Sequence, residues 1–196
     1  MALFARYYIG EKGRVEREPV TTLTRVEAFL DACHGHRGVG RCRQLLRMAR
    51  DNARSPKEIE LHLLLALPAE IGGYGLGGDV LNYRVDPNGA TVDRPDRRYA
   101  EPDLAWLDQR VAVEYLGKEH DSTVPEDRRR INMLTALRWY VLQVDRFQLS
   151  DPALLDVTSR QVAQLLECSV PEPTDEWLAS RGELRKLLLG EGHVRM

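Results

Sequence analysis

The stretch YAEPDLAWLDQRVAVEYL, residues 99–116, decides the fold of the middle of the chain. Its first part, 99–107, is rich in apolar and aromatic residues, and its last part, 111–116, is rich in β-branched residues. Both compositions are typical of strands, and the polar Asp-Gln-Arg at 108–110 favours a turn between them. The stretch therefore predicts a β-hairpin that brings Asp103 and Glu114 to the same end of a sheet.

Asp103 and Glu114 are the leading candidates for a functional site. Two carboxylates held a few ångströms apart repel each other, so such a pair is stable where a divalent cation lies between them. Glu114 also lies inside an otherwise apolar strand, where a charge without a partner is costly. The pair predicts a hydrolytic metal site for Mg²⁺ or Mn²⁺. Because Mg²⁺ keeps several waters, two carboxylates and the backbone carbonyl of Tyr115 are enough to hold it.

Composition sets only mild limits on function. The chain has 196 residues, of which 43% are hydrophobic and 30% charged, as in a globular protein with one core or with a compact domain and a helical extension. The three cysteines form no disulfide framework, and no signal peptide or membrane span is expected. We therefore expect a cytoplasmic protein with reduced thiols and no membrane partner. The net charge of −2 gives no general attraction to nucleic acid, so such binding would need a local basic patch.

Apolar periodicity and turn signals predict helices first, then a sheet, then helices. The helix that opens at Ser55 has a strong start signal, with Ser55 as N-cap, Pro56 at the first helical position and Glu58 three residues after the cap. The remaining elements expected besides the hairpin are helices near 24–33, 41–52, 125–137, 151–167 and 174–189, strands at 80–85 and 139–144, and a candidate short strand at 7–9. This pattern predicts an α/β fold.

Five short motifs occur in order along the chain. The predicted elements there are a helix, three strands, a second helix and a last strand. The motifs are Ser55–Glu58, Pro102–Trp106, Val113–His120, Asp127–Arg130 and Leu137–Leu142. Their types and order resemble the PD-(D/E)xK nuclease superfamily, and more closely its very-short-patch-repair-like endonuclease branch. That branch includes small endonuclease-like domains that follow a helical segment in abortive-infection-type regulators. The resemblance covers about residues 40–165.

The resemblance implies a metal-dependent DNA endonuclease of defence or repair, which hydrolyses phosphodiester bonds. It implies a small mixed β-sheet flanked by helices, with an N-terminal helical segment at 1–54, an endonuclease-like core at 55–168 and a C-terminal helical extension at 169–196. The residues that it implies are Asp103 and Glu114 as metal ligands and catalytic residues, and Glu58 and His120 as further catalytic residues. The run of Arg128, Arg129 and Arg130 is a candidate for contacts with DNA phosphates.

The chain departs from the family pattern at Leu116. In the superfamily the residue two after the Glu is a Lys, and in the closer branch it is an Asp followed by Gly; here it is Leu116, followed by Gly117. The positive group that would offset charge in the transition state is therefore absent from its expected position. Lys118 and His120 are near in sequence, and the closer branch has a His about where His120 falls.

Several candidates also have a purely structural explanation. A capping box alone accounts for Glu58, and His120 lies in a polar run that is typical of an exposed loop. The arginines at 128–130 follow acidic residues at a predicted helix start, where a solvated face with local salt bridges is common. Gln143, on the last predicted strand of the sheet, could point at the metal site or into the core.

Two classes of function remain open: an active endonuclease, and a non-catalytic nucleic-acid-binding or regulatory protein on a nuclease fold. Leu116 favours the second class. Intact Asp103, Glu114 and His120 favour the first, because an inactive site is expected to lose its buried carboxylates. A third possibility is an antitoxin- or effector-like partner protein in which the helices at 150–196 form a protein interface. The apolar side chains of these helices must pack on their own domain or on a second copy, so a homodimer is a candidate assembly.

Overall fold

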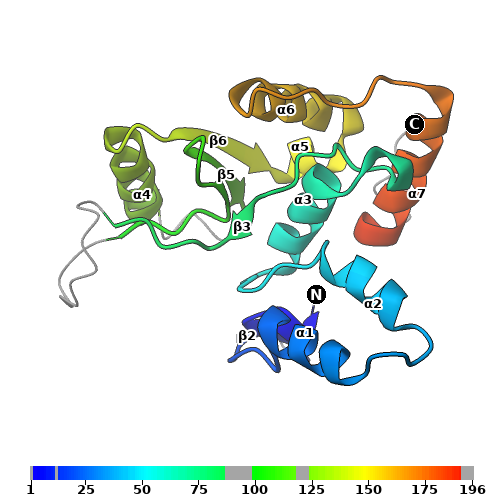
Figure 1. Ribbon diagram of the computed structural model, residues 1–196. Coiled ribbons are helices and arrows are strands. Elements are labelled where there is room, and N and C mark those ends of the chain that lie inside the picture. Colours follow the sequence, from blue (N-terminus) through cyan, green and yellow to red (C-terminus); the bar gives the residue numbers. More distant parts are fainter. Residues whose placement is uncertain (1, 12, 87–98, 118–123, 191–196) are drawn as a thin grey trace. The chain divides into compact units, whose positions relative to one another are not determined.

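The computed structural model describes residues 2–11, 13–86, 99–117 and 124–190. The chain divides into two compact units, residues 1–59 and 60–196, and the division falls within helix α3 (Pro56–Ala66). Figure 1 shows the ribbon of both units with the elements labelled.

The N-terminal unit contains a β-hairpin as well as helices. A 3-10 turn, η1 (Ala2–Phe4), precedes β1 (Tyr7–Gly10) and β2 (Gly13–Glu16), which pair antiparallel, and α1 (Leu23–Ala32) and α2 (Val39–Leu46) follow. Thr22 caps α1 by accepting a hydrogen bond from the Arg25 N–H, as expected of a threonine at this position. The carboxylate of Asp51 accepts from the Leu23 N–H at 3.1 Å, which ties the end of the unit to the start of α1.

The second unit is built on one mixed sheet of four strands. The strands are β3 (Val80–Leu81), β4 (Leu104–Trp106), β5 (Val111–Leu116) and β6 (Tyr140–Asp145), and they lie side by side in that order. β3, β4 and β5 pair antiparallel, whereas β6 runs parallel to β5 after the connecting helix α4 (Val124–Ala136). The predicted α/β class, with a small mixed sheet and flanking helices, is confirmed.

The predicted hairpin is present, with a longer turn. Trp106 pairs with Val111, so the connection is Leu107–Arg110 rather than the three residues 108–110. Arg110 has a φ of 54° in this turn, and its N–H donates to the Leu107 carbonyl. The strand predicted at 80–85 is also shorter than expected, because regular pairing covers only Val80–Leu81, and Val85 makes a single bridge to Ala100.

The core of the second unit lies around β5 and the helices on the sheet. Residues 111–114 of β5 are all buried, as expected for a strand covered on both faces. On the face that carries Ala112, Leu134 of α4 joins a buried cluster with Val85 and Ala100. The side chains packed around that cluster are Met133, Leu137, Trp139 and Val141. α4 therefore covers the sheet face to which Ala112 points.

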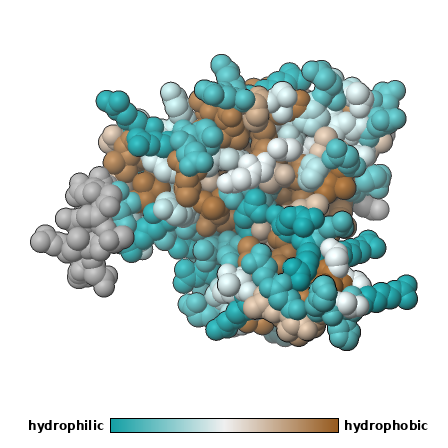
Figure 2. Space-filling view, in the orientation of Figure 1, coloured by the Kyte–Doolittle hydropathy of each residue, from teal (hydrophilic) through white to brown (hydrophobic). Residues whose placement is uncertain are grey.

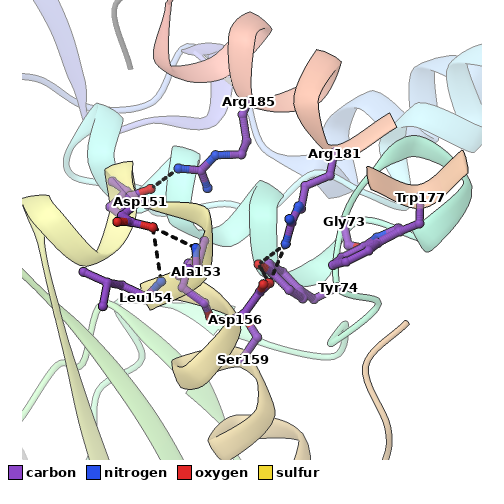
Figure 3. A network of polar contacts seen from close by, with 12 residues as sticks. Gly73, Tyr74, Asp151, Ala153, Leu154, Asp156, Ser159, Trp177, Arg181 and Arg185 are labelled. Carbon is purple, nitrogen blue, oxygen red and sulfur yellow. Dashed lines mark hydrogen bonds and ion pairs between the residues drawn. The ribbon is translucent and has the colours of Figure 1, made fainter. Parts of the chain in front are cut away.

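The other helices in the described part of the second unit are the short 3-10 helix η2 (Ala69–Ile71), α5 (Arg146–Ser150), α6 (Pro152–Leu165) and α7 (Asp175–Leu189). α7 is held through polar contacts of Trp177, Arg181 and Arg185 (Figure 3). The Trp177 Nε1–H donates to the Gly73 carbonyl at 3.0 Å, and Arg181 forms an ion pair with Asp156 at 2.5 Å. Trp177, Leu184 and Leu189 are buried, whereas Leu178 and Leu187 are exposed, so only part of the apolar surface of α7 is covered.

Arg185 is the most buried cation of α7, with 2% of its surface exposed. It donates to the carbonyls of Leu149 and Ser150 at the end of α5. Burial lowers the pKa of Arg185 from its ordinary value, and these carbonyl acceptors offset part of the cost of burying the charge. Among the helices of the described residues, none combines the length and the hydropathy needed to cross a bilayer.

Candidate functional site

The register of the sheet places four residues with side-chain oxygens in one row across the strands. They are Asn82, Asp103, Glu114 and Gln143. Leu104 pairs with Val113, so the next position outward sets Asp103 opposite Glu114, and Glu114 in turn pairs with Gln143 of β6. The Asn82 N–H donates to the Asp103 carbonyl at 3.2 Å, which extends the row beyond β3. Residues paired side by side in a sheet are close neighbours, so the row gathers these polar groups at one level of the sheet.

Asp103 lies at the point where β4 begins. Its Oδ2 accepts a hydrogen bond from the Tyr115 N–H at 2.7 Å, so the carboxylate satisfies a β5 backbone donor. Pro102 before it is buried and has no N–H to donate. The predicted approach of Asp103 to the end of β5 is therefore present, and this hydrogen bond fixes the position of the carboxylate.

Glu114 is the most buried acid of the row, with 1% of its surface exposed. Its Oε2 accepts from Arg130 Nη2 at 3.0 Å, in an ion pair that links β5 to α4. A buried carboxylate is costly unless an opposite charge and hydrogen bonds compensate it, and Arg130 supplies both. Arg130, which the sequence suggested as a DNA contact, thus has a partner within the chain, and 31% of its side chain remains exposed.

The remaining predicted DNA contacts, Arg128 and Arg129, are exposed on α4 and so remain accessible to a ligand. His120 and Lys118 lie outside the described residues. Leu116, at the position where the family pattern has a charged residue, is half-buried at the end of β5. Burial raises the pKa of the neighbouring Tyr115 hydroxyl, and the negative charge of Glu60 adds to the shift, so Tyr115 is a neutral hydroxyl at neutral pH.

Glu58 belongs to the N-terminal unit, where its contacts fit a capping role. Its N–H donates to Ser55 Oγ at 3.2 Å, and its Oε2 accepts from the Arg54 N–H at 2.8 Å. In a capping box the Glu58 carboxylate would accept from the N–H of the N-cap, Ser55. Here it accepts from the N–H of Arg54, one residue earlier, which is a variant of the capping box. A catalytic role for Glu58 stays a prediction.

A groove of about 490 Å³ lies between the edge strand β6 and α6. Its lining is uncharged, and the residues that form it are Val141, Leu142, Gln143, Gln148, Thr158, Gln161, Gln164 and Leu165. Gln143 connects this groove to the row that contains Glu114, and the residue is exposed rather than buried in the core. Apolar residues also reach the surface in this unit, among them Tyr140 and Phe147, and Figure 2 shows apolar and hydrophilic residues intermixed on the visible face.

A buried pair between His62 of α3 and Asp79 was not predicted from the sequence. His62 Nδ1 and Asp79 Oδ2 are 2.6 Å apart, and both side chains are almost fully buried. A histidine within the run Leu61–Leu65 was a signal that a polar partner had to exist, but the identity of that partner depends on the fold. The pair is shut off from solvent, so it supports packing rather than substrate contact.

The residues of the row fit a hard divalent cation by their chemistry. Asp103 and Glu114 supply carboxylate oxygens, and Mg²⁺ is commonly held by one or two carboxylates and waters. Within the described residues no group of three or more His, Cys, Asp or Glu side chains is placed to hold a metal, so any ion here would depend on this pair. Comparison with protein-family models, curated proteins and solved structures finds no match for this chain.

Proposed function

We propose that this chain is a metal-dependent DNA endonuclease of the very-short-patch-repair-like type. The observation that carries the proposal is that Asp103, directly before β4, continues the antiparallel register and so falls opposite Glu114 of β5. The hydrogen bond from the Tyr115 N–H to Asp103 Oδ2 holds one carboxylate, and Arg130 holds the other. In this proposal, the two carboxylates, each fixed by a separate partner, would together hold the cation.

The order of elements supports the same proposal. The chain has α3, β3, β4, β5, α4 and β6 in succession, with Asp103 directly before β4 and Glu114 within β5. This is the order that the PD-(D/E)xK resemblance implies, with the acidic residues at the corresponding positions. Because unrelated functions can share a fold, we infer catalysis from the acidic pair rather than from the topology.

Asp103 and Glu114 would hold Mg²⁺ or Mn²⁺, which when bound supplies Lewis-acid stabilisation of the phosphodiester and activates water. Arg130 would provide the positive charge that Leu116 cannot provide. Its guanidinium lies 3.0 Å from Glu114 and is partly exposed, so it can donate to a phosphate oxygen without leaving the site. In this proposal Arg130 offsets charge that develops on the phosphate during hydrolysis.

Cleavage of DNA by the purified chain tests the proposal. Supercoiled, linear and single-stranded DNA are each incubated with Mg²⁺, Mn²⁺ or EDTA, and nicks are counted on gels. We expect metal-dependent cleavage that falls at least about a hundred-fold in Glu114→Gln, because several kcal/mol of charge stabilisation depend on the bound ion. Asp108→Asn is the matched control, since Asp108 is an exposed acid in the turn of the same hairpin. Equal rates in wild type and Glu114→Gln would exclude catalysis at this site.

A second candidate function is a non-catalytic nucleic-acid-binding or regulatory module on the same fold. The ion pair between Glu114 and Arg130 favours it, because the pair can serve stability alone and Leu116 leaves the usual third charged position empty. The two candidates differ in their response to metal. A binding module retains DNA in EDTA and shows no turnover with Mg²⁺ or Mn²⁺ in the cleavage assay.

A further inference from the structure

The N-terminal unit contains a pocket of about 380 Å³ whose lining consists entirely of charged residues. The residues are Arg6, Glu16, Arg17, Glu18 and Arg54. Three guanidinium groups and two carboxylates thus surround one space, with an excess of positive charge. This pocket lies apart in sequence from the acidic pair of the sheet, and its side chains have no part in the function proposed above.

The fold of the unit brings the three arginines together from three segments. Tyr7 pairs with Glu16 in the hairpin, and the Arg17 N–H donates to the Arg6 carbonyl at 3.0 Å, so Arg6 and Arg17 face each other at the base of the hairpin. The Arg6 N–H donates to the Ala53 carbonyl at 2.8 Å, which brings Arg54 to the same place. The convergence is therefore fixed by backbone hydrogen bonds.

Like charges opposite each other in a hairpin destabilise it. Arg6 forms an ion pair with Glu18 at 3.5 Å, but the two side chains are 42% and 85% exposed, and such surface pairs contribute little. The lining has three guanidinium groups and two carboxylates, so an anion in the pocket would offset its excess positive charge. The planar fork of a guanidinium matches the oxygens of a phosphate group and binds them in pairs, which Lys cannot do.

We propose that this pocket binds a phosphate group. The group can belong to a nucleic-acid strand or to a small phosphorylated molecule, and the chemistry of recognition is the same for both. Arg6, Arg17 and Arg54 donate to the phosphate oxygens, and Glu16 and Glu18 limit the affinity by their opposing charge.

Binding to the full chain is measured in EDTA, so that the result does not depend on metal or on cleavage. The probes are inorganic pyrophosphate, by calorimetry, and a short fluorescent single-stranded oligonucleotide without a terminal phosphate, by anisotropy. Binding of pyrophosphate alone identifies a free or terminal phosphate as the ligand, whereas binding of the oligonucleotide identifies the backbone phosphodiester. Absence of binding to both probes overturns the proposal.

Charge-removing variants locate the site. We expect Arg17→Gln and Arg54→Gln each to weaken binding about ten-fold or more, because each removes charge-assisted hydrogen bonds. Arg25→Gln, which makes the same charge change at an exposed position of α1, should leave the affinity within about two-fold. If all three variants bind alike, the arginine cluster is an internal ion-pair arrangement and the proposal fails.

Glu16→Gln gives a result that partial unfolding cannot imitate. Removing a negative charge from the pocket should strengthen phosphate binding several-fold, since an opposing charge is lost at short range. A weaker or unchanged affinity in Glu16→Gln contradicts the proposal. These outcomes are independent of the Glu114→Gln cleavage test, so one proposal can fail while the other stands.

Discussion

Arg130 of α4 lies 3.0 Å from the carboxylate of Glu114 on β5, and this ion pair joins the crossover helix to the centre of the sheet. The two partners are unequal in burial: Glu114 is 1% exposed at its side chain and Arg130 is 31% exposed. The guanidinium already faces solvent in part and can be hydrated if its partner is lost, whereas the carboxylate is largely screened from solvent. The loss of each partner should therefore have a different cost.

We predict that Arg130→Gln destabilises the chain more than Glu114→Gln does. Arg130→Gln leaves a buried carboxylate without its compensating charge and should lower the free energy of unfolding by about 3 kcal/mol. Glu114→Gln leaves a partly exposed guanidinium and should cost about 1 kcal/mol. Urea unfolding followed by circular dichroism measures both, with Arg129→Gln as an exposed control that should change stability by less than about 0.5 kcal/mol. Equal losses for the two partners would argue against this account of the pair.

Asp103→Asn should separate the structural role of Asp103 from its charge. The amide oxygen of Asn can still accept from the Tyr115 N–H, so stability should change by less than about 1 kcal/mol, whereas Asp103→Ala loses this bond and should cost about 1–2 kcal/mol. If the proposed endonuclease reading holds, both variants lose metal-dependent cleavage, because both remove the negative charge. Urea unfolding and plasmid nicking on the same preparations provide the two readouts. An Asp103→Asn protein with full cleavage activity would remove Asp103 from the site.

The elements that the sequence predicted well are those with a local chemical signal. Asp151 caps α6 by accepting from the Ala153 and Leu154 N–H groups, and Thr174 caps α7 by accepting from the Trp177 N–H, at the two predicted starts. The hairpin at 99–116 was predictable for the same reason, because its strand and turn residues are adjacent in sequence. Only the length of the turn differed from the prediction. Arg110 adopts a positive φ in this turn, and an arginine gives no signal in the sequence for that conformation.

Pairing across the fold was not predictable in the same way. Arg130 was singled out for DNA because it belongs to an arginine run, and its contact with Glu114 depends on how α4 crosses from β5 to β6. His62 and Asp79 are 17 positions apart and meet only after α3 has packed beside the sheet. Helix α2 ends at Leu46 rather than near 52, because the chain after it turns so that Asp51 can accept from the Leu23 N–H.

Tyr74 should make stability fall at high pH. Burial raises the pKa of its hydroxyl above the ordinary value, and the hydrogen bond to Asp156 adds to the shift. The unfolded chain loses this proton near pH 10 while the folded chain keeps it, so the contribution is complete below about pH 10 and is lost as the pH rises further. Tyr74→Phe should cost about 1–2 kcal/mol at neutral pH, because the bond to a charged acceptor is lost, and this difference should shrink above about pH 10.

Urea unfolding of wild type and Tyr74→Phe across this pH range measures the difference. Tyr83→Phe is the control, since Tyr83 is an exposed tyrosine of the same unit. A difference between wild type and Tyr74→Phe that stays constant up to strongly alkaline pH would contradict the assignment to the Tyr74 proton.

Gly72 and Gly75 lie three residues apart and both have positive φ values, 90° and 73°, but only Gly72 is pressed against α7. A Cβ at Gly72 would lie 2.4 Å from the Ser180 carbonyl oxygen and 2.6 Å from the Arg181 N, whereas a Cβ at Gly75 meets nothing within 4 Å. Gly75→Ala should therefore cost only the strain of a left-handed alanine, about 1–2 kcal/mol. Gly72→Ala adds a clash with helix backbone, which cannot rotate away, and should cost about 1–3 kcal/mol more.

Thermal and urea unfolding of the two variants test this difference directly. The clash displaces α7, so Gly72→Ala should also loosen the packing of Trp177, whose Nε1–H donates to the adjacent Gly73 carbonyl. A red shift of the tryptophan emission in Gly72→Ala, absent in Gly75→Ala, is the expected signature. If both variants lose the same stability and keep the same emission, the close contact with Ser180 does not hold α7 in place.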